Sequence, residues 1–184
     1  MFVFCASVHH TGTNFVSKLF TDLGYEFTDK TPKEAGNSVN YFHRCHIGDS
    51  TATELGEWLN VDVPLIVPLR HPIEVAKSWL ARDKPIERMV RQFQILNERV
   101  DCHNPLYLPI DHPYREQYFN YLRLATDLEL STEWPVIASK REGSTHRAQL
   151  TVPEPSAADI KLLVALAHTP LLNKFYPEPW EFWQ

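Results

Sequence analysis

Hydrophobic positions form short runs separated by segments of helical periodicity. Residues 2–8 and 63–69 are nearly continuous apolar runs, which predict strands buried on both faces of a parallel sheet. Residues 39–46 and 134–139 predict two further strands. Strands that alternate with helices indicate an α/β fold, with a mainly parallel sheet flanked by helices.

The segments between the strands carry apolar residues at helical spacing. In residues 13–23 this pattern is followed by Gly24, a typical helix stop. Pro72 comes after the second long run and predicts the first residue of a helix over 72–82. The other predicted helices cover residues 51–59, with Thr51 or Thr53 as the expected cap, 85–101, 114–128 and 156–168.

Composition narrows the class of protein. The chain has 184 residues and no repeat or linker, so we expect a single domain over residues 1–184. A net charge of −5 argues against a nucleic-acid partner bound by bulk positive charge, but it permits a local basic pocket. Three widely spaced cysteines form no disulfide framework or zinc motif, which favours a cytoplasmic protein. The sequence shows no signal peptide and no membrane-spanning run, so we expect no membrane association.

The stretch FCASVHHTGTNF, residues 4–15, is a buried strand that runs into a polar turn and a helix. A helix beginning near Thr13 would direct its free N–H groups and positive dipole end at the turn, which suits an anion. Gly12 would let the backbone approach that ligand closely. A nucleotide-binding P-loop reads GxxxxGK(S/T), but Thr13 and Asn14 occupy its last two positions, which disfavours ordinary ATP hydrolysis. An ordinary strand–helix turn remains an alternative.

The stretch LRHPIEVAKSW, residues 69–79, follows the second long run. It resembles the 3′-phosphate element of sulfotransferases that use 3′-phosphoadenosine 5′-phosphosulfate (PAPS). That element reads R-x-P-x-x-x-x-x-S and is followed by an aromatic residue; Arg70, Pro72, Ser78 and Trp79 match it. The resemblance implies a P-loop NTPase-like, three-layer α/β/α sulfotransferase fold, in which Arg70 and Ser78 bind the 3′-phosphate.

The opening turn is similar to the 5′-phosphosulfate loop of the same family, P-K-S-G-T-T-W. The residue at the aromatic position would stack on adenine, and Asn14 replaces the last threonine. His10 replaces the loop lysine, and a protonated imidazole would take over its charge only in part at neutral pH. The resemblance implies that the cofactor contacts His10, Thr11, Gly12, Thr13, Asn14 and Phe15.

Two further stretches resemble the family. Arg44 and His46 match a K-x-H strand end, which implies that His46 is the catalytic base and that Arg44 assists it. Because they are two positions apart in a predicted strand, we expect both on one face. The segment KREG, residues 140–143, resembles a late R-K-G segment, which implies cofactor contacts by Lys140 and Arg141.

The resemblance implies a compact microbial or viral sulfotransferase. It would move a sulfuryl group from PAPS to a hydroxyl or amine of a small-molecule or glycan acceptor, releasing adenosine 3′,5′-bisphosphate (PAP) and requiring no metal. Residues 80–135 would form a helical region on the acceptor side. Two alternatives stay open: a non-catalytic module that binds a nucleotide or a protein, and a nucleotide or small-molecule kinase, which the missing GK(S/T) disfavours.

Simpler roles also stay open for these residues. The ligand types of His9, His10, His43, Cys45 and His46 suit zinc, but His43 and His46 point to opposite faces of a strand, so we predict no metal site. Arg70 could form a surface ion pair, and Ser78 could bond its own helix backbone. A solvated helix face is expected for Lys84, Arg88 and Arg91.

Overall fold

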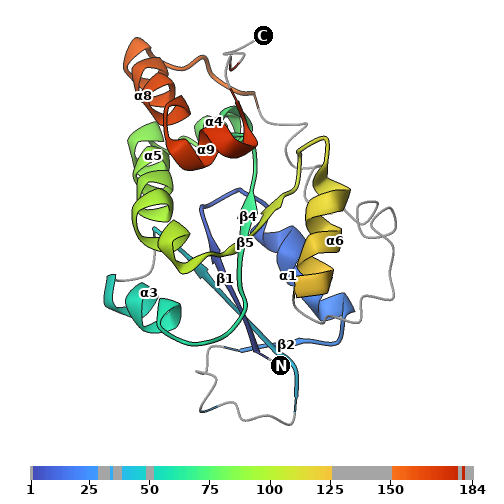
Figure 1. The fold of residues 1–184 in the computed structure, drawn as a ribbon. Coiled ribbons are helices and arrows are strands. Elements are labelled where there is room, and N and C mark those ends of the chain that lie inside the picture. The colour runs from blue at the N-terminus through green and yellow to red at the C-terminus, as the bar shows by residue number, and fades with distance from the viewer. Residues whose placement is uncertain are drawn as a thin grey trace.

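The computed structural model describes residues 2–28, 34, 39–48, 52–125, 151–177 and 180 (Figure 1). Within these residues the strands form one all-parallel sheet in the order β2-β3-β1-β4-β5. The strands are β1 (Phe2–Ser7), β2 (Glu26–Phe27), β3 (Tyr41–His46), β4 (Leu65–Leu69) and β5 (Leu106–Pro109). The predicted α/β class with a parallel sheet is confirmed.

Helices cover both faces of the sheet. One face carries α1 (Thr13–Asp22) and α6 (Arg115–Ala125). The other carries α3 (Ala52–Leu59), α4 (Pro72–Leu80), α5 (Ile86–Ile95), α8 (Ala157–Ala167) and α9 (Pro170–Phe175). A π turn (Leu96–Val100) and a 3-10 turn (Asp101–His103) extend α5. Among the described helices, none is both long enough and apolar enough to cross a membrane.

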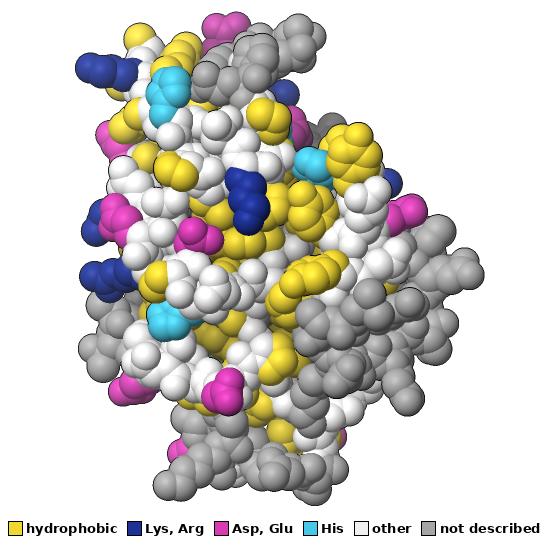
Figure 2. Space-filling model, in the orientation of Figure 1, with side chains coloured by type: hydrophobic (Ala, Val, Ile, Leu, Met, Phe, Trp, Pro, Cys, Tyr) yellow, Lys and Arg dark blue, Asp and Glu magenta, His cyan; other side chains and the backbone are white. Residues whose placement is uncertain are grey.

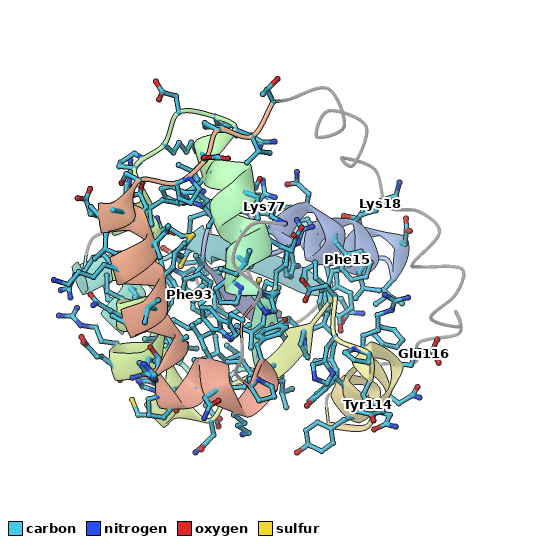
Figure 3. All side chains as sticks on the ribbon, turned by 90° about the horizontal axis from the view of Figure 1, so that it is seen from above. Phe15, Lys18, Lys77, Phe93, Tyr114 and Glu116 are labelled. Carbon is cyan, nitrogen blue, oxygen red and sulfur yellow. The ribbon has the colours of Figure 1, made fainter. Side chains whose placement is uncertain are left out.

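The central strand β1 is buried on both faces. Val3 and Cys5 pack into the cluster beneath α1 and α6, whereas Phe4 and Ala6 pack into the cluster beneath α4, α5 and α8. In Figure 3, Phe93 of α5 lies in the interior of this second cluster, while Tyr114 and Glu116 lie at the periphery. The continuous apolar run at the start of the chain thus has the two-sided burial that parallel sheets require.

Several predicted boundaries are confirmed and others are corrected. Gly24 has φ 80° just after α1, and Pro72 begins α4. Thr53 lies inside α3, so it is not the cap, and Thr51 lies outside the described residues. The helix predicted over 114–128 is described only to 125, and the strand predicted over 134–139 lies outside the described residues.

Two strands and one helix were not predicted. β2 has only two residues, both exposed, and α9 has only six, so neither shows a measurable period. β5 lies within 80–135, where a helical region was expected, and it ends at Pro109, a residue that weakens a strand pattern. As the edge strand of the described sheet, β5 tolerates this proline.

The strand order creates a topological switch point at the carboxyl ends of β1 and β4. These strands are neighbours, but α1 follows β1 onto one face and α4 follows β4 onto the other. In open parallel sheets, such a change of side is where ligands bind.

Candidate functional site

The turn between β1 and α1 is tightly folded. Thr11 donates two hydrogen bonds to the Val8 carbonyl oxygen, from its N at 3.3 Å and its Oγ1 at 2.7 Å. His10 and Gly12 have φ 67° and 108°. The positive φ of Gly12 favours glycine, and a Cβ there would also lie 2.4 Å from Cδ1 of Ile110, so the end of that side chain would have to move.

The amino end of α1 carries no negative charge of its own. Gly12 is its N-cap, no described side chain caps the helix, and the first turn contains no acidic residue. Its first N–H groups and its positive dipole end therefore lie at the carboxyl end of β1 in a form that suits an anion.

The two loop threonines use their hydroxyl hydrogens within the protein. Both side chains are buried; Thr11 donates to Val8, and Thr13 Oγ1 donates to Ser7 Oγ at 3.1 Å. Because a hydroxyl has one hydrogen to donate, these residues would offer an anion mainly their backbone N–H groups. Phe15 is half-buried on α1 and packs against the core, so part of its ring is already covered (Figure 3).

Ser7 links the loop to the end of β3. Its Oγ accepts from Thr13, donates to the Cys45 carbonyl oxygen at 3.2 Å and lies 3.3 Å from Nδ1 of His46. The single hydroxyl hydrogen of Ser7 is donated to the Cys45 carbonyl oxygen. The hydrogen of the contact with His46 must therefore come from His46 Nδ1. The other ring nitrogen of His46, Nε2, then carries the lone pair that a general base needs.

Arg44 contacts α1 on the same side of the sheet. Its Nη1 donates to Ser17 Oγ at 3.0 Å and, weakly, to the exposed Asn14 Oδ1 at 3.5 Å. Its guanidinium also lies 5.5 Å from the ring centroid of Phe27. Arg44 is in register with Cys5 and His46 with Ser7, and Ser7 Oγ contacts both His46 and Thr13 of α1, so the shared face predicted for Arg44 and His46 is confirmed.

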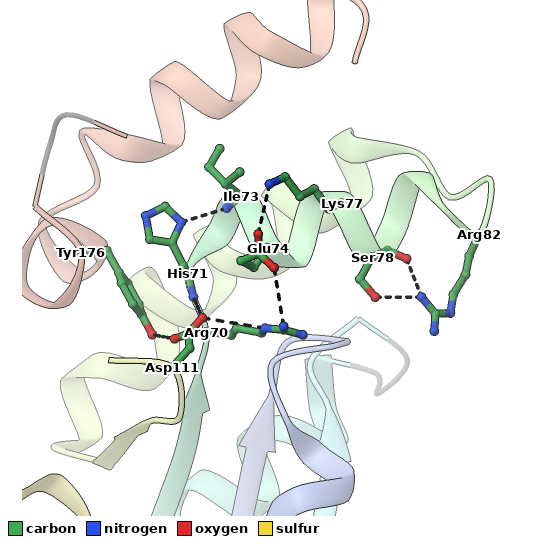
Figure 4. A network of polar contacts seen from close by, with 9 residues as sticks. All are labelled: Arg70, His71, Ile73, Glu74, Lys77, Ser78, Arg82, Asp111 and Tyr176. Atoms are coloured by element: carbon green, nitrogen blue, oxygen red, sulfur yellow. Dashed lines mark hydrogen bonds and ion pairs between the residues drawn. The ribbon is translucent and has the colours of Figure 1, made fainter. Parts of the chain in front are cut away.

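Arg70 follows β4 and lies between two carboxylates (Figure 4). Its Nη2 is 3.6 Å from Glu74 Oε2, and its Nε is 3.8 Å from Asp111 Oδ2. Both distances exceed the roughly 2.7–2.9 Å of a charge-assisted hydrogen bond. The ion pairing considered from the sequence is therefore present, but in a loose form.

Asp111 joins three segments of the fold. Its Oδ2 accepts from the His71 backbone N at 2.9 Å, and its Oδ1 accepts from the Tyr176 hydroxyl at 2.8 Å (Figure 4). Burial, and then the Asp111 charge, raise the pKa of Tyr176, so this hydroxyl stays a donor. Burial lowers the pKa of His71, whose Nδ1 accepts from Ile73 N at the start of α4. The network positions Arg70 through its carboxylate partner.

Ser78 is buried, and its side chain is bonded to a cation instead of only to its own helix backbone. Arg82 Nη1 donates to both Ser78 Oγ and the Ser78 carbonyl oxygen, each at 2.8 Å (Figure 4). Sequence reasoning missed Arg82, although its spacing of four residues from Ser78 on a predicted helix end was a usable signal. The Ser78 subsite thus contains a guanidinium.

His10 lies against Trp79 with its ring edge to ring face. The centroids are 6.0 Å apart at 85°, and Lys84 Nζ lies 5.4 Å from the Trp79 centroid. Burial, and then the charges of Arg82 and Lys84, lower the pKa of His10 to about 4. Without a bound anion, the partial protonation of His10 considered from the sequence is thus disfavoured. Lys84, for which a solvated helix face was expected, lies against an aromatic ring instead of only facing solvent.

Two helices hold the backbone of His9. Gln92 on α5 is buried, and its Oε1 accepts from His9 N at 3.0 Å, while Trp79 Nε1 on α4 donates to the His9 carbonyl oxygen at 3.3 Å. The His9 ring stacks on His46 with centroids 4.1 Å apart. No local pattern pointed to Gln92, because its partner is 83 positions away. These contacts fix the loop beside the proposed base.

Two predicted cofactor contacts fall in a part of the chain that the structure does not describe. Lys140 and Arg141 lie outside the described residues. His43 stacks on Trp58 with centroids 3.9 Å apart, whereas His46 stacks on His9. Within the described ranges, no group of three or more His, Cys, Asp or Glu side chains is arranged to hold a metal.

A hollow lies beside β5, away from the loop between β1 and α1. It has a volume of about 310 Å³ and is lined mainly by aromatic side chains, with Lys174 and Asp101 among its polar residues. Figure 2 shows hydrophobic side chains gathered on this face over β5, between α6 and α9. The aromatic lining comprises Tyr107, Tyr118, Tyr121 and Phe175.

No family model matches the chain, and searches of curated proteins and of solved structures find no match either.

Proposed function

We propose that the protein is a PAPS-dependent sulfotransferase with a P-loop-like sulfotransferase fold. One observation carries the proposal: three stretches that match the family, far apart in sequence, end three adjacent strands. The loop follows β1, Arg44 and His46 end β3, and Arg70 follows β4. Because β3, β1 and β4 are neighbours, these residues lie at one edge of the sheet, where open parallel sheets bind ligands.

The residues present suit an anionic cofactor. The uncapped amino end of α1 would hold the phosphosulfate group through backbone N–H groups. Arg70 and Ser78 would hold the 3′-phosphate, and Arg82, which is hydrogen-bonded to Ser78, would lie beside them. Phe15 would contact adenine with the uncovered part of its ring.

His46 would act as the general base. Its Nε2 would take the proton from the acceptor hydroxyl or amine as the acceptor oxygen or nitrogen bonds to sulfur. The bond between sulfur and the phosphate oxygen breaks, and PAP leaves with that electron pair. The protein then contributes positioning and charge stabilisation, as in phosphoryl transfer.

A second candidate is a nucleotide-binding module without transfer activity. The lowered pKa of His10 favours it, because the loop position that holds a lysine in the family carries no charge at neutral pH here. Thr11 and Thr13 also use their hydroxyl hydrogens internally.

Thermal shift measurements with PAP in EDTA, followed by transfer assays with labelled PAPS, test the proposal. We expect PAP to raise the melting temperature without Mg²⁺, and Arg70→Gln to remove most of that rise. Arg99→Gln, at an exposed position, is the matched control. PAP binding without transfer to phenol, amine and sugar acceptors would favour the module. A response to Mg-ATP but not to PAP would favour the kinase and overturn the proposal.

A further inference from the structure

The cationic side chains near the loop differ in how their charge is balanced. Arg70 lies close to two carboxylates, Glu74 and Asp111. Neither Arg82 nor Lys84 forms an ion pair with a carboxylate among the described residues. The turn after α4 therefore carries positive charge that the described part of the protein does not pair.

The backbone after α4 brings Lys84 onto the helix end. Asp83, an exposed residue, has φ 53°, and its N–H donates to the Leu80 carbonyl oxygen at 2.9 Å. The next N–H, that of Lys84, donates to the Trp79 carbonyl oxygen at 3.1 Å. This left-handed turn folds the chain back and places the Lys84 ammonium over the Trp79 ring.

Trp79 joins the two basic residues to the loop. Its side chain is buried and contacts the His10 ring edge to face, and its indole N–H donates to the His9 carbonyl oxygen. Arg82 lies one helical turn after Ser78, the residue that precedes Trp79. Its Nη1 donates two hydrogen bonds to Ser78, which hold the guanidinium there. A guanidinium has five N–H donors, so these two contacts use only part of its capacity.

A polar atom beside Trp79 has no hydrogen-bond partner among the described residues. His10 Nε2 is buried and makes no hydrogen bond with the described residues. The groups that face the imidazole are Arg82, Lys84, His9 and His46, and none is negatively charged. After burial, the charges of Arg82 and Lys84 contribute most to the lowered pKa of His10, so they lie near enough to act on a group beside it.

We propose that Arg82 and Lys84 form, with His10, an anion subsite around Trp79 that supplies the positive charge missing from the loop. Its ligand class is a phosphate or sulfate ester, whose oxygens accept hydrogen bonds from guanidinium, ammonium and imidazole N–H groups. The inference rests on the proposed function: the anion is either the 5′-phosphosulfate group or the 3′-phosphate of PAPS.

The double variant Arg82→Gln/Lys84→Gln tests the subsite by calorimetric titration with PAP. We expect its affinity to fall by about tenfold for each charge removed, since hydrogen bonds to charged groups are the strong ones. The control Arg91→Gln/Lys161→Gln removes the same total charge at exposed positions on α5 and α8 and should keep wild-type affinity. Equal affinities of both double variants and the wild type would overturn the proposal.

Two shorter ligands identify the anion. A selective loss of affinity for adenosine 5′-monophosphate assigns the subsite to the 5′ group, and a selective loss for adenosine 3′-monophosphate assigns it to the 3′-phosphate. If the double variant melts well below the wild type, Arg82→Lys/Lys84→Arg replaces it. This variant keeps both charges and should retain PAP binding.

The His10 resonance in NMR titrations separates failure of the subsite from failure of the proposed function. In the double variant without ligand, the pKa of His10 should rise because two nearby cations are removed. In the wild type, sulfate or pyrophosphate should also raise it. If PAP does not bind the wild type, the sulfotransferase proposal fails, but a sulfate-dependent rise that the double variant loses still supports the subsite. No effect of these anions on His10 would overturn it.

Discussion

Ser7 Oγ lies 3.3 Å from Nδ1 of His46, at the paired ends of the neighbouring strands β1 and β3. Ser7 is fully buried and also contacts Thr13 and the Cys45 carbonyl oxygen. Its three contacts leave one consistent arrangement of hydrogens, in which Nε2 is the basic nitrogen of His46. A residue that touches no substrate would thus set the chemical state of the proposed base.

Replacing Ser7 by alanine should remove this control over His46. We expect kcat to fall about tenfold or more while the Kd for PAP changes little, because the hydroxyl orients the base rather than the cofactor. Nitrogen chemical shifts of His46 should change from one tautomer to a mixture. Loss of the hydroxyl also leaves Thr13 with an unpaired buried group, which should cost about 1–3 kcal/mol in the free energy of unfolding.

His46→Ala provides the comparison for Ser7→Ala. It should abolish transfer and leave PAP binding nearly intact. Retained transfer would remove His46 from the base role, and an unchanged tautomer in Ser7→Ala would remove Ser7 from the positioning role.

Gly12→Ala should destabilise the protein more than Gly24→Ala does. Both glycines have positive φ, 108° and 80°, so both substitutions carry a conformational cost of about 1 kcal/mol. Only at Gly12 does the new Cβ clash, at 2.4 Å from Cδ1 of Ile110; no heavy atom lies within 4 Å at Gly24. Urea unfolding of both variants measures the difference, which we expect to exceed 1 kcal/mol.

A second substitution identifies the cause of the Gly12 effect. Ile110→Val removes the clashing Cδ1, so it should recover part of the stability lost in Gly12→Ala. Additive effects of the two substitutions would show that the contact is not the cause.

The sequence predicted the parts of the fold that have local signals. The apolar run of β1, Gly24 after α1 and Pro72 at the start of α4 each act within a few residues. The strand order brings the three candidate stretches to one edge of the sheet, as α/β topology predicts.

Periodicity could not predict the contacts that set the chemistry of these residues. Gln92 meets His9 and Asp111 meets the His71 backbone, across 83 and 40 positions. Such pairs depend on how helices pack over the sheet, and no local pattern encodes them. The position of Lys84 depends on one left-handed residue, Asp83, a conformation that a non-glycine residue rarely signals.

Glu74→Gln should strengthen the binding of PAP. Glu74 Oε2 lies 3.6 Å from Arg70 Nη2, where it competes with a bound phosphate for the guanidinium. Removing its charge should lower the Kd about two- to fivefold, while stability changes by less than about 1 kcal/mol because the pair is partly exposed. Glu116→Gln, on α6 at the periphery in Figure 3, removes the same charge and should leave the Kd unchanged. A weaker affinity in Glu74→Gln would mean that Glu74 orients Arg70 rather than competes with its ligand.

The stability of the ligand-free protein should fall as the pH is lowered from about 6.5 to about 4, in part through His10. The pKa of His10 is about 4 in the folded protein, against 6.5 as the ordinary value, because of burial and then the charges of Arg82 and Lys84. Between these values the unfolded chain binds a proton that the folded protein does not, so acid favours unfolding. Urea unfolding at several pH values measures the slope.

His10→Gln isolates this contribution, because glutamine does not titrate and its amide is similar in size and polarity to imidazole. The variant should lose stability less steeply than the wild type between about pH 6.5 and 4, with the two curves parallel above pH 7. Other groups, above all carboxylates, still produce a slope in both proteins, and the difference between the curves belongs to position 10. Saturating PAP should reduce this difference in the wild type, because an anion beside His10 raises its pKa toward the unfolded value. Parallel curves over the whole range would show that His10 keeps an ordinary pKa, and the cationic surroundings inferred for the loop would then be wrong.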